Sequence, residues 1–330
     1  MRQRIGRLTF GLVFLLAVFA SQAFAQKPVQ ISGASTKLAP ALATDGNYMY
    51  IAWVDSSTSD IYYASYSSGF TDAQPVGGTT TDGTTWTAES SATPAWGYDG
   101  VSFYLIWKGK SDNNIWFSQL SGGIWQDQAL VQGGSKTTAW TADTNVAPAA
   151  TFNSWPLTLY WKGQSSNNVW TSSLNDLQPG WLTQATTGLE TNVAPAVESD
   201  PNGSEGSPIV IKSASNNYIY ASGFQISGTG PTWYAETSEP PAAAFNGEND
   251  VVFWKGETTT SIYYSYNTGT PLGSGGPPTW TNQQTVSGAA TDAAPAVAIA
   301  NGPSISVALL AWKNASNNTI WYTVGSAFPE

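Results

Sequence analysis

The sequence predicts an all-β protein: a six-bladed β-propeller of four-stranded antiparallel blades, closed by an N-terminal strand that completes the last blade. Helix signals are nearly absent, and Gly and Pro separate short runs rich in β-branched and aromatic residues. A Pro-Ala pair recurs at spacings of 54, 54, 47, 46 and 54 residues, the length of a blade. A β-solenoid is the alternative, but it would use shorter, parallel repeats without Asn-Gly hairpins.

The first 25 residues have the features of a secretory signal peptide. Three arginines precede an apolar run, and the stretch ends in the small-x-small motif Ala23-Phe24-Ala25. A membrane anchor is the alternative, but the apolar run is shorter than the roughly 20 residues of a membrane span. We therefore expect residues 1–25 to be removed and the protein to be secreted or periplasmic. Residues 26–330 are then one propeller domain.

Each repeat contains the same five features in order, and the repeats begin near residues 37, 91, 145, 192, 238 and 292. The Pro-Ala pair is followed by an Asp-Gly or Asn-Gly type turn, which supplies the positive φ of a tight hairpin. A strand ending in Trp-Lys-Gly comes next, then a polar turn and a strand rich in Ile, Trp and Tyr. The turn pairs are Asp45-Gly46, Asp99-Gly100, Asn153-Ser154, Asn202-Gly203, Asn246-Gly247 and Asn301-Gly302.

The two ends of the chain match one another. The last repeat stops after its third strand, while residues 31–40 align without a gap with residues 286–295, which lead into that repeat. Residues near 28–33 should therefore supply the missing fourth strand, which leaves no free sheet edge.

Composition excludes several classes of function. The chain has no cysteine and no histidine, which removes disulfide scaffolds, common zinc and haem ligands and histidine-dependent triads. After the leader there is no arginine, and nine lysines stand against 22 acids. That balance argues against a nucleic acid partner and an anionic membrane surface. We expect no membrane insertion, no cofactor and no metal site, since no EF-hand spacing is present.

Two repeated polar features fall in loops on one face of the predicted ring. A lysine follows the central Trp, and an acid stands five residues before the Pro. They could flank pockets between blades and hydrogen-bond a polar ligand such as a sugar. The structural alternative is a ring of lysine–acid surface pairs, worth roughly 0–1 kcal/mol each. The residues are Lys108, Lys162, Lys212, Lys255 and Lys313, with Glu89, Asp143, Glu190 and Glu236.

The aromatic residues divide into two groups. The tryptophans on the central strands are expected to pack between adjacent blades: Trp53, Trp107, Trp161, Trp254 and Trp312. Trp86 and Trp140 instead lie in polar insertions beside an acid, where an indole could stack against the apolar face of a sugar ring. The segment Trp233-Tyr234-Ala235-Glu236 repeats that pattern. These insertions are therefore candidate binding loops.

The tandem pattern Pro-Ala, Asn-Gly, Trp-Lys-Gly and Asn-Asn-Ile-Trp resembles the repeat of secreted β-propeller lectins, including the six-bladed fucose-binding type. The resemblance covers the whole mature chain at the level of the blade pattern. It implies sugar pockets between blades that use an arginine, a glutamate and an aromatic residue. The glutamate position corresponds to Glu89, Asp143, Glu190 or Glu236, whereas the arginine position is empty.

The sequence therefore predicts a multivalent carbohydrate-binding protein that is not an enzyme, with glycans or glycoconjugates as partners. A non-catalytic protein-interaction or surface-structure propeller is the alternative, and a glycoside hydrolase is a distant third. A sialidase would need an arginine cluster for the carboxylate of its substrate, which the mature chain lacks. The predicted ligand-binding residues are Trp86, Glu89, Lys108, Trp140, Asp143, Lys162, Glu190, Glu236, Lys255 and Lys313.

Overall fold

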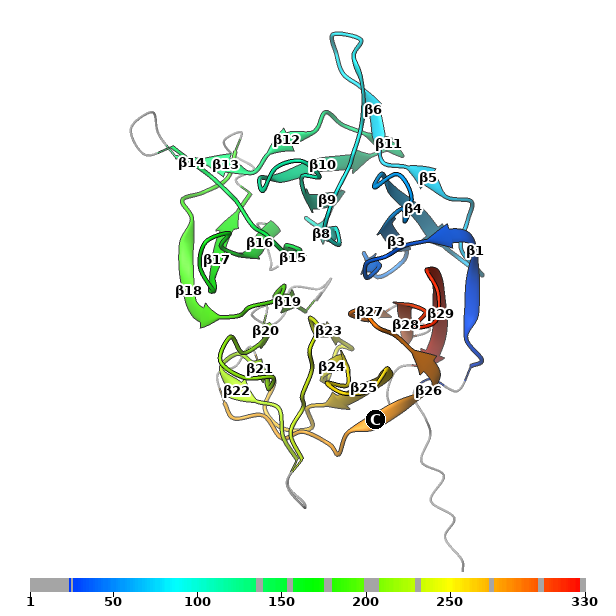
Figure 1. Ribbon diagram of the computed structural model, residues 1–330, viewed down its shortest axis with the longest axis vertical. Coiled ribbons are helices and arrows are strands. Elements are labelled where there is room, and N and C mark those ends of the chain that lie inside the picture. The colour runs from blue at the N-terminus through cyan, green and yellow to red at the C-terminus, as the bar shows by residue number, and fades with distance from the viewer. Residues whose placement is uncertain are drawn as a thin grey trace, which may run out of the picture.

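The protein is a ring of six antiparallel β-sheets, which confirms the predicted fold class (Figure 1). The computed structural model describes residues 24, 26–134, 139–152, 157–174, 180–198, 208–228, 233–272, 276–301 and 306–326. Within these ranges the chain forms strands and turns, and no helix in them is long and apolar enough to cross a membrane.

Each blade is built from consecutive strands, except the last. Blade 1 contains β2 (Ala41–Thr44), β3 (Met49–Val54), β4 (Ile61–Tyr66) and β5 (Gln74–Pro75). Blade 2 contains β8 (Ala95–Tyr98), β9 (Phe103–Lys108), β10 (Ile115–Ser121), β11 (Ile124–Trp125) and β12 (Ala129–Leu130). Blade 3 contains β15 (Ala149–Phe152), β16 (Leu157–Lys162), β17 (Asn168–Ser173) and β18 (Ala185–Glu190). Blade 4 contains β19 (Ala196–Val197), β20 (Ile209–Lys212), β21 (Ile219–Ala221) and β22 (Phe224–Gln225). Blade 5 contains β23 (Ala242–Phe245), β24 (Asp250–Lys255), β25 (Ser261–Tyr266) and β26 (Gln284–Ala290). Blade 6 contains β27 (Ala296–Asn301), β28 (Ser306–Lys313), β29 (Thr319–Ser326) and β1 (Val29–Ser35).

Two short hairpins stand outside the blades. They are β6 (Gly77–Thr79) with β7 (Thr85–Thr87), and β13 (Gln132–Gly133) with β14 (Trp140–Thr141). They follow blades 1 and 2, and the first projects beyond the rim of the ring (Figure 1). These hairpins are the two polar insertions of the sequence.

The innermost strands close the ring. Each of β2, β8, β15, β19, β23 and β27 contacts the next, and β27 contacts β2. The Pro-Ala pairs lie at the start of these strands and line a cavity on the ring axis. The most regular feature of the sequence is therefore the inner wall of the propeller.

Tryptophans from the central strands fill the space between blades, as expected. Trp53, Trp107, Trp161, Trp254 and Trp312 are each at most 2% exposed. Each packs against the preceding blade; Trp107 of blade 2, for example, contacts the cluster around Ile61 and Val76 of blade 1. In blade 4 the smaller Ile211 takes this position and is 4% exposed. A buried aromatic wedge of this size is the main apolar contribution at each interface.

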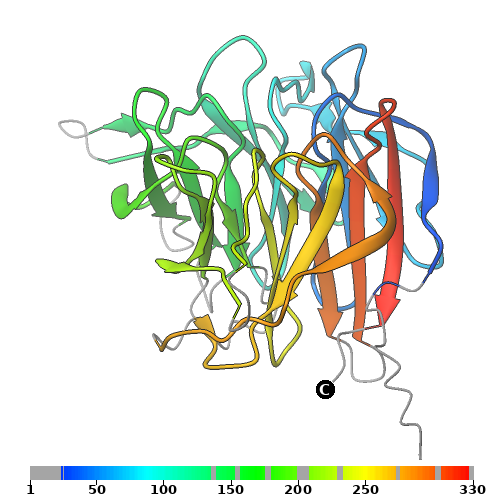
Figure 2. The same ribbon diagram turned by 60° about the horizontal axis from the view of Figure 1, so that its bottom comes forward.

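The N-terminal strand completes blade 6, as the matched ends of the chain predict. β1 pairs antiparallel with β29, joining Val29 to Tyr322 and Gln30 to Trp321, and the two strands run side by side in Figure 2. Gly33 of β1 and Gly288 of β26 both have a φ of 73°. The two aligned segments therefore make the same bend in their blades.

The Asp-Gly and Asn-Gly pairs form tight turns wherever the structure describes them. Gly46, Gly100 and Gly247 have φ values of 90°, 89° and 96°. The preceding side chain caps the turn: Asp45 Oδ1 accepts hydrogen bonds from the backbone N–H groups two and three residues later. The turns at Asn153-Ser154 and Asn202-Gly203, as well as Gly302, lie outside the described residues.

The expected leader lies mostly outside the described residues, with one exception. Residues 1–23 and Ala25 are not described, but Phe24 is, and it is only 3% exposed. Its ring packs edge-on against Phe253 at 5.6 Å and Tyr264 at 6.4 Å between the centroids. Cleavage after Ala25 would thus remove a side chain that belongs to the core between blades 5 and 6.

Candidate functional site

The repeated lysines point into the protein. All five are 4–9% exposed, and burial lowers the pKa of Lys108, Lys162 and Lys212. Each Nζ donates a hydrogen bond to the side chain two residues after the acid position. The acceptors of Lys108, Lys162, Lys212, Lys255 and Lys313 are Ser91 (2.8 Å), Asn145 (3.0 Å), Asn192 (2.8 Å), Ser238 (3.1 Å) and Asp292 (2.6 Å).

These bonds tie the linker between blades to the central strand of the next blade. The intervening hydroxyl is buried as well: Thr144, for example, is 0% exposed and donates to the carbonyl of Val146 at 3.2 Å. In blade 1 a valine, Val54, replaces the lysine, and Lys37 stands at the acceptor position. The lysine ammonium groups are therefore used inside the protein, and their contact with a ligand stays a prediction.

The acids lie at the mouths of the clefts between blades rather than beside these lysines. Glu89, Asp143 and Glu190 are exposed, and Glu236 is half-buried. Glu89 forms an ion pair with Lys110, with its Oε1 2.6 Å from Nζ. The other described ion pair joins Lys313 to Asp292, also at 2.6 Å. The predicted lysine–acid ring therefore does not form as such.

The hairpin tryptophans stack on the buried wedges of the following blade. Trp86 lies on Trp107 with 6.4 Å between ring centroids, and Trp140 lies on Trp161 at 6.1 Å. Trp233 stacks on Trp254 in the same way, at 6.3 Å. Trp86, Trp140 and Trp233 are all half-buried, so part of each indole is covered by the central-strand Trp on which it stacks. Stacking of a sugar on Trp86 or Trp140 stays a prediction.

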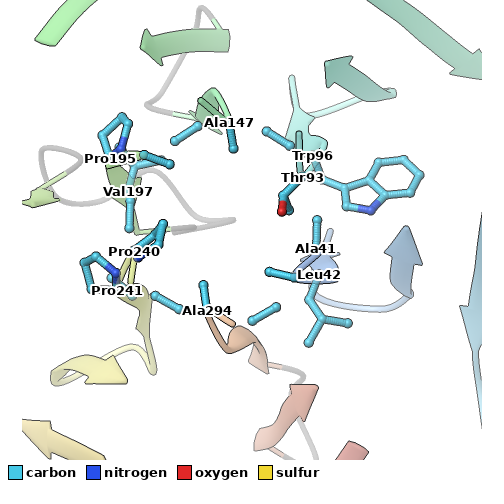
Figure 3. Close-up of a pocket in the computed structure, with 18 of the residues that line it drawn as sticks. Ala41, Leu42, Thr93, Trp96, Ala147, Pro195, Val197, Pro240, Pro241 and Ala294 are labelled. Atoms are coloured by element: carbon cyan, nitrogen blue, oxygen red, sulfur yellow. The ribbon is translucent and has the colours of Figure 1, made fainter. Parts of the chain in front are cut away.

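The cavity on the ring axis has little chemistry to offer. It has a volume of about 150 Å³ and is lined by Pro, Ala and a few larger apolar residues from all six blades (Figure 3). Thr93 supplies its one hydroxyl, and none of its lining residues is charged. This cavity lacks the convergent polar groups of a specific ligand site.

A second cavity, of about 270 Å³, lies between blades 4 and 5 and combines aromatic with polar groups. Tyr234, from the linker, is 42% exposed and lies 5.3 Å from Tyr218 of blade 4 between centroids. The lining residues are Tyr234, Glu236, Trp254, Gly256, Glu257, Thr258, Thr259, Tyr263 and Gln283. We call this the Glu236–Glu257 cleft.

The backbone of blade 5 is shaped to hold the aromatic wall of this cleft. Tyr263 lies across the strand from Trp254, and their rings stack at 6.2 Å. A Cβ atom at Gly256 would lie 2.7 Å from the Tyr263 ring. The glycine of the Trp-Lys-Gly motif is therefore required here because an aromatic ring lies directly over it.

Two carboxyl groups meet in the cleft. Glu236 and Glu257 both line the cavity, and Glu257 is close enough to raise the pKa of Glu236. Desolvation raises the pKa of Glu236 above its ordinary value of 4.5, and the charge and side-chain contact of Glu257 raise it further. Asn217 of blade 4 donates a hydrogen bond to Glu257 and holds it across the cleft.

Of the predicted site residues, Glu236 alone lines this cleft, and three important members were not predicted. Tyr234 stands where the other two hairpins carry Thr87 and Thr141, and Glu257 is the one acid among the residues that follow the Trp-Lys-Gly position. Tyr263 occupies the third-strand aromatic position. A comparison of the repeats position by position could have identified Tyr234 and Glu257 as departures.

The carboxyl pair should make stability depend on pH. Because the raised pKa means that the folded state binds the proton more tightly, this group stabilises the fold below its ordinary pKa. That contribution is lost as the pH rises through the raised value. We expect Glu257→Gln to raise the melting temperature by about 1 °C at pH 7 and by nothing at pH 3.5.

Thermal denaturation followed by circular dichroism at both pH values measures this effect. Glu190→Gln is the matched control because its cleft has Ala214 opposite the acid, so its melting temperature should not show the same pH dependence. A Glu257→Gln protein less stable than the original at pH 7 would show that the two carboxyl groups do not repel one another in the folded protein.

Comparison with known proteins supports the fold. No protein family model and no curated protein matches the chain. Among solved structures it is similar to the "Hadza microbial sialidase Hz136", with a TM-score of 0.52 and 11% identity over 89% of this chain and 66% of that one. It is also similar to a subtype N11 neuraminidase-like protein of A/flat-faced bat/Peru/033/2010, with a TM-score of 0.52 and 8% identity over 92% and 94% of the two chains.

These similarities correct one prediction. The expectation that the protein is not an enzyme is wrong as an inference from the repeats, because a sialidase shares this architecture. A further neighbour, a subtype N10 neuraminidase-like protein, has a TM-score of 0.50 and 9% identity. Identities of this size show a common fold, so function must be argued from the residues of the cleft.

Proposed function

We propose that the protein is an exported carbohydrate-binding propeller and that its principal site is the Glu236–Glu257 cleft. The lining of this cleft carries the proposal: aromatic rings of Tyr234 and Tyr263 beside two carboxyl groups, two threonine hydroxyls and an amide. Sugars present apolar C–H faces and hydroxyls that both donate and accept hydrogen bonds. A site with aromatic walls and a few convergent polar groups matches that surface.

The other clefts lack parts of this set. Thr87 and Thr141 stand at the position of Tyr234 in the hairpins after blades 1 and 2, and between blades 1 and 2 Lys110 already neutralises Glu89. We therefore propose one strong site rather than six equal ones. Export is supported by the leader sequence, with its basic start, apolar run and small-x-small motif.

Binding should depend on Tyr234. We expect Tyr234→Ala to weaken the binding of the sugar identified on a glycan array at least about ten-fold, because an exposed aromatic wall is lost. Isothermal titration calorimetry measures the affinity. Tyr48→Ala is the control, since Tyr48 is 62% exposed in the turn between β2 and β3, at the other end of the blade.

No binding to any glycan by the folded protein would remove this proposal and favour the protein-interaction propeller. Equal affinity of the Tyr234→Ala variant and the original protein would place the sugar elsewhere.

A glycoside hydrolase is the second candidate, and the carboxyl pair favours it. Such enzymes use one carboxyl kept protonated and a second carboxylate, and Glu236 has a raised pKa beside Glu257. Release of nitrophenol from a panel of nitrophenyl glycosides, absent in a Glu236→Gln variant, would establish hydrolysis. A sialidase specifically is disfavoured because no arginine follows residue 7 to bind a substrate carboxylate.

A further inference from the structure

At each interface between blades, the same two positions of the repeat lie close together. One is the acid position of the linker, and the other is the residue that follows the Trp-Lys-Gly position. In blade order the pairs are Ser35 with Ser56, Glu89 with Lys110, Asp143 with Gln164, Glu190 with Ala214, Glu236 with Glu257, and Ala290 with Ala315. Contacts between the two positions are described in every cleft but that of Asp143. The two positions therefore have the same place at each interface, whereas the charge and polarity of their side chains differ from one interface to the next.

One cleft contains an ammonium group supplied by the chain itself. Lys110 Nζ donates to Glu89 Oε1 at 2.6 Å and to the carbonyl of Thr58 at 3.0 Å. The carboxylate comes from the linker and the carbonyl from the turn of the preceding blade. This arrangement is therefore able to hold a primary ammonium.

The cleft between blades 4 and 5 has the equivalent carboxylate and carbonyl positions but no lysine. Glu236 corresponds to Glu89, and Asn216 corresponds to Thr58, because Thr237 and Ser90 donate backbone hydrogen bonds to the equivalent carbonyls of Asn217 and Ser59. At the position of Lys110 stands Glu257. Compared with the cleft that holds Lys110, this cleft therefore has a second carboxylate in place of the ammonium. Glu236 and Glu257 both line its cavity of about 270 Å³.

Among the described residues that line this cavity, none is a cation that could compensate the charge of the two carboxylates. Lys212 is close enough to interact with Glu257, but it is 4% exposed and its Nζ donates to Asn192 Oδ1. The lining instead contributes the rings of Tyr234 and Tyr263. Aromatic faces attract cations, so rings and carboxylates act in the same direction.

We propose that the Glu236–Glu257 cleft binds a sugar that carries a protonated amine, with the ammonium held between the two carboxylates. The proposal rests on the carbohydrate-binding function above and specifies its ligand. Thr258, Thr259 and Gln283 offer partners for ring hydroxyls, which a lysine side chain would leave unused. An amino sugar therefore satisfies more of the lining than a lysine of a protein partner does.

Three methyl glycosides that differ only at C2 test the charge. Methyl β-glucosaminide, its N-acetyl derivative and methyl β-glucoside are titrated calorimetrically into the full chain at pH 6.5. We expect the glucosaminide to bind at least ten-fold more tightly than the other two, with an affinity that falls as salt is added. Nα-acetyl-lysine methylamide is a fourth probe and should bind more weakly than the glucosaminide.

Glu257→Lys rebuilds the arrangement seen at Lys110. It should fold with an unchanged or higher melting temperature and lose glucosaminide binding at least ten-fold. Glu248→Lys makes the same charge change in the exposed turn between β23 and β24, at the other end of blade 5, and should bind as the original protein does. If Glu257→Lys fails to fold, Glu257→Gln serves, with the same direction of effect.

The outcomes separate this proposal from the function on which it rests. Tighter binding of a neutral glycoside than of the glucosaminide would overturn the amino-sugar assignment and leave carbohydrate binding intact. Tighter binding of the lysine derivative would make the cleft a site for protein lysines. Failure of all four probes, together with a blank glycan array, would overturn both proposals.

Discussion

A protein that begins at Ser35, and therefore lacks most of β1, should melt about 10 °C or more below the intact chain. β1 supplies the outer strand of blade 6, and its Ile31 and Ala34 are 6% and 3% exposed in the core between blades 6 and 1. Loss of this burial and of the ladder to β29 costs about 5 kcal/mol. It also leaves β29 as an unpaired edge that can associate with other chains.

Differential scanning calorimetry measures the effect, and a peptide of residues 26–34 added back provides the control. The peptide should raise the melting temperature in proportion to the logarithm of its concentration, because it binds only the folded ring. A shortened protein that melts within 2 °C of the intact one would show that the ring holds without its N-terminal strand.

The fold could be predicted from the sequence because its information is local and repeated. Pro-Ala pairs, Asp-Gly turns and central tryptophans recur in register, and the structure uses each of them in nearly every blade. The closure was predictable for the same reason, since residues 31–40 copy a segment whose place in blade 5 is fixed by its own repeat. Each repeat by itself predicts its strands only weakly, but six repeats with the same order of features predict the same four-stranded blade.

The role of the lysines was harder to predict. Alternation along a strand normally places the neighbour of a buried Trp on the other, wetter face. The central strand of a propeller blade is covered on both faces by its neighbours, so all six residues of β9 are buried, Lys108 included. The lysine keeps its charge by donating to carbonyl and side-chain oxygens at the end of the strand.

The binding cleft was only partly predictable because its chemistry lies in a pair. Glu236 occupies an acid position shared with three other repeats, and Glu257, although the one acid at its own repeat position, carries no signal of a partner. Their significance appears when blades 4 and 5 bring them together in a cavity beside Tyr234. The sequence pattern of a single repeat does not show which of its residues contact the neighbouring repeat.

The burial of Phe24 leads to a second large effect. A protein that begins at Phe24 should be more stable than one that begins at Gln26 by about 2–3 kcal/mol, or about 5 °C in melting temperature. Without Phe24, the space beside Phe253 and Tyr264 would lose its occupant, although Thr323 would still donate to the carbonyl of Gln26 at 2.9 Å. Thermal melts of the two purified proteins measure the difference.

The same burial bears on where the leader is removed. Ser21-Gln22-Ala23 satisfies the small-x-small rule as well as Ala23-Phe24-Ala25 does, and cleavage after Ala23 leaves Phe24 in the folded protein. We expect the intact mass of the exported protein to correspond to a start at Phe24, and Phe24→Leu to retain most of the stability that Phe24→Ser loses. A mass that begins at Gln26, with equal stability of both purified forms, would show that Phe24 is dispensable to the core.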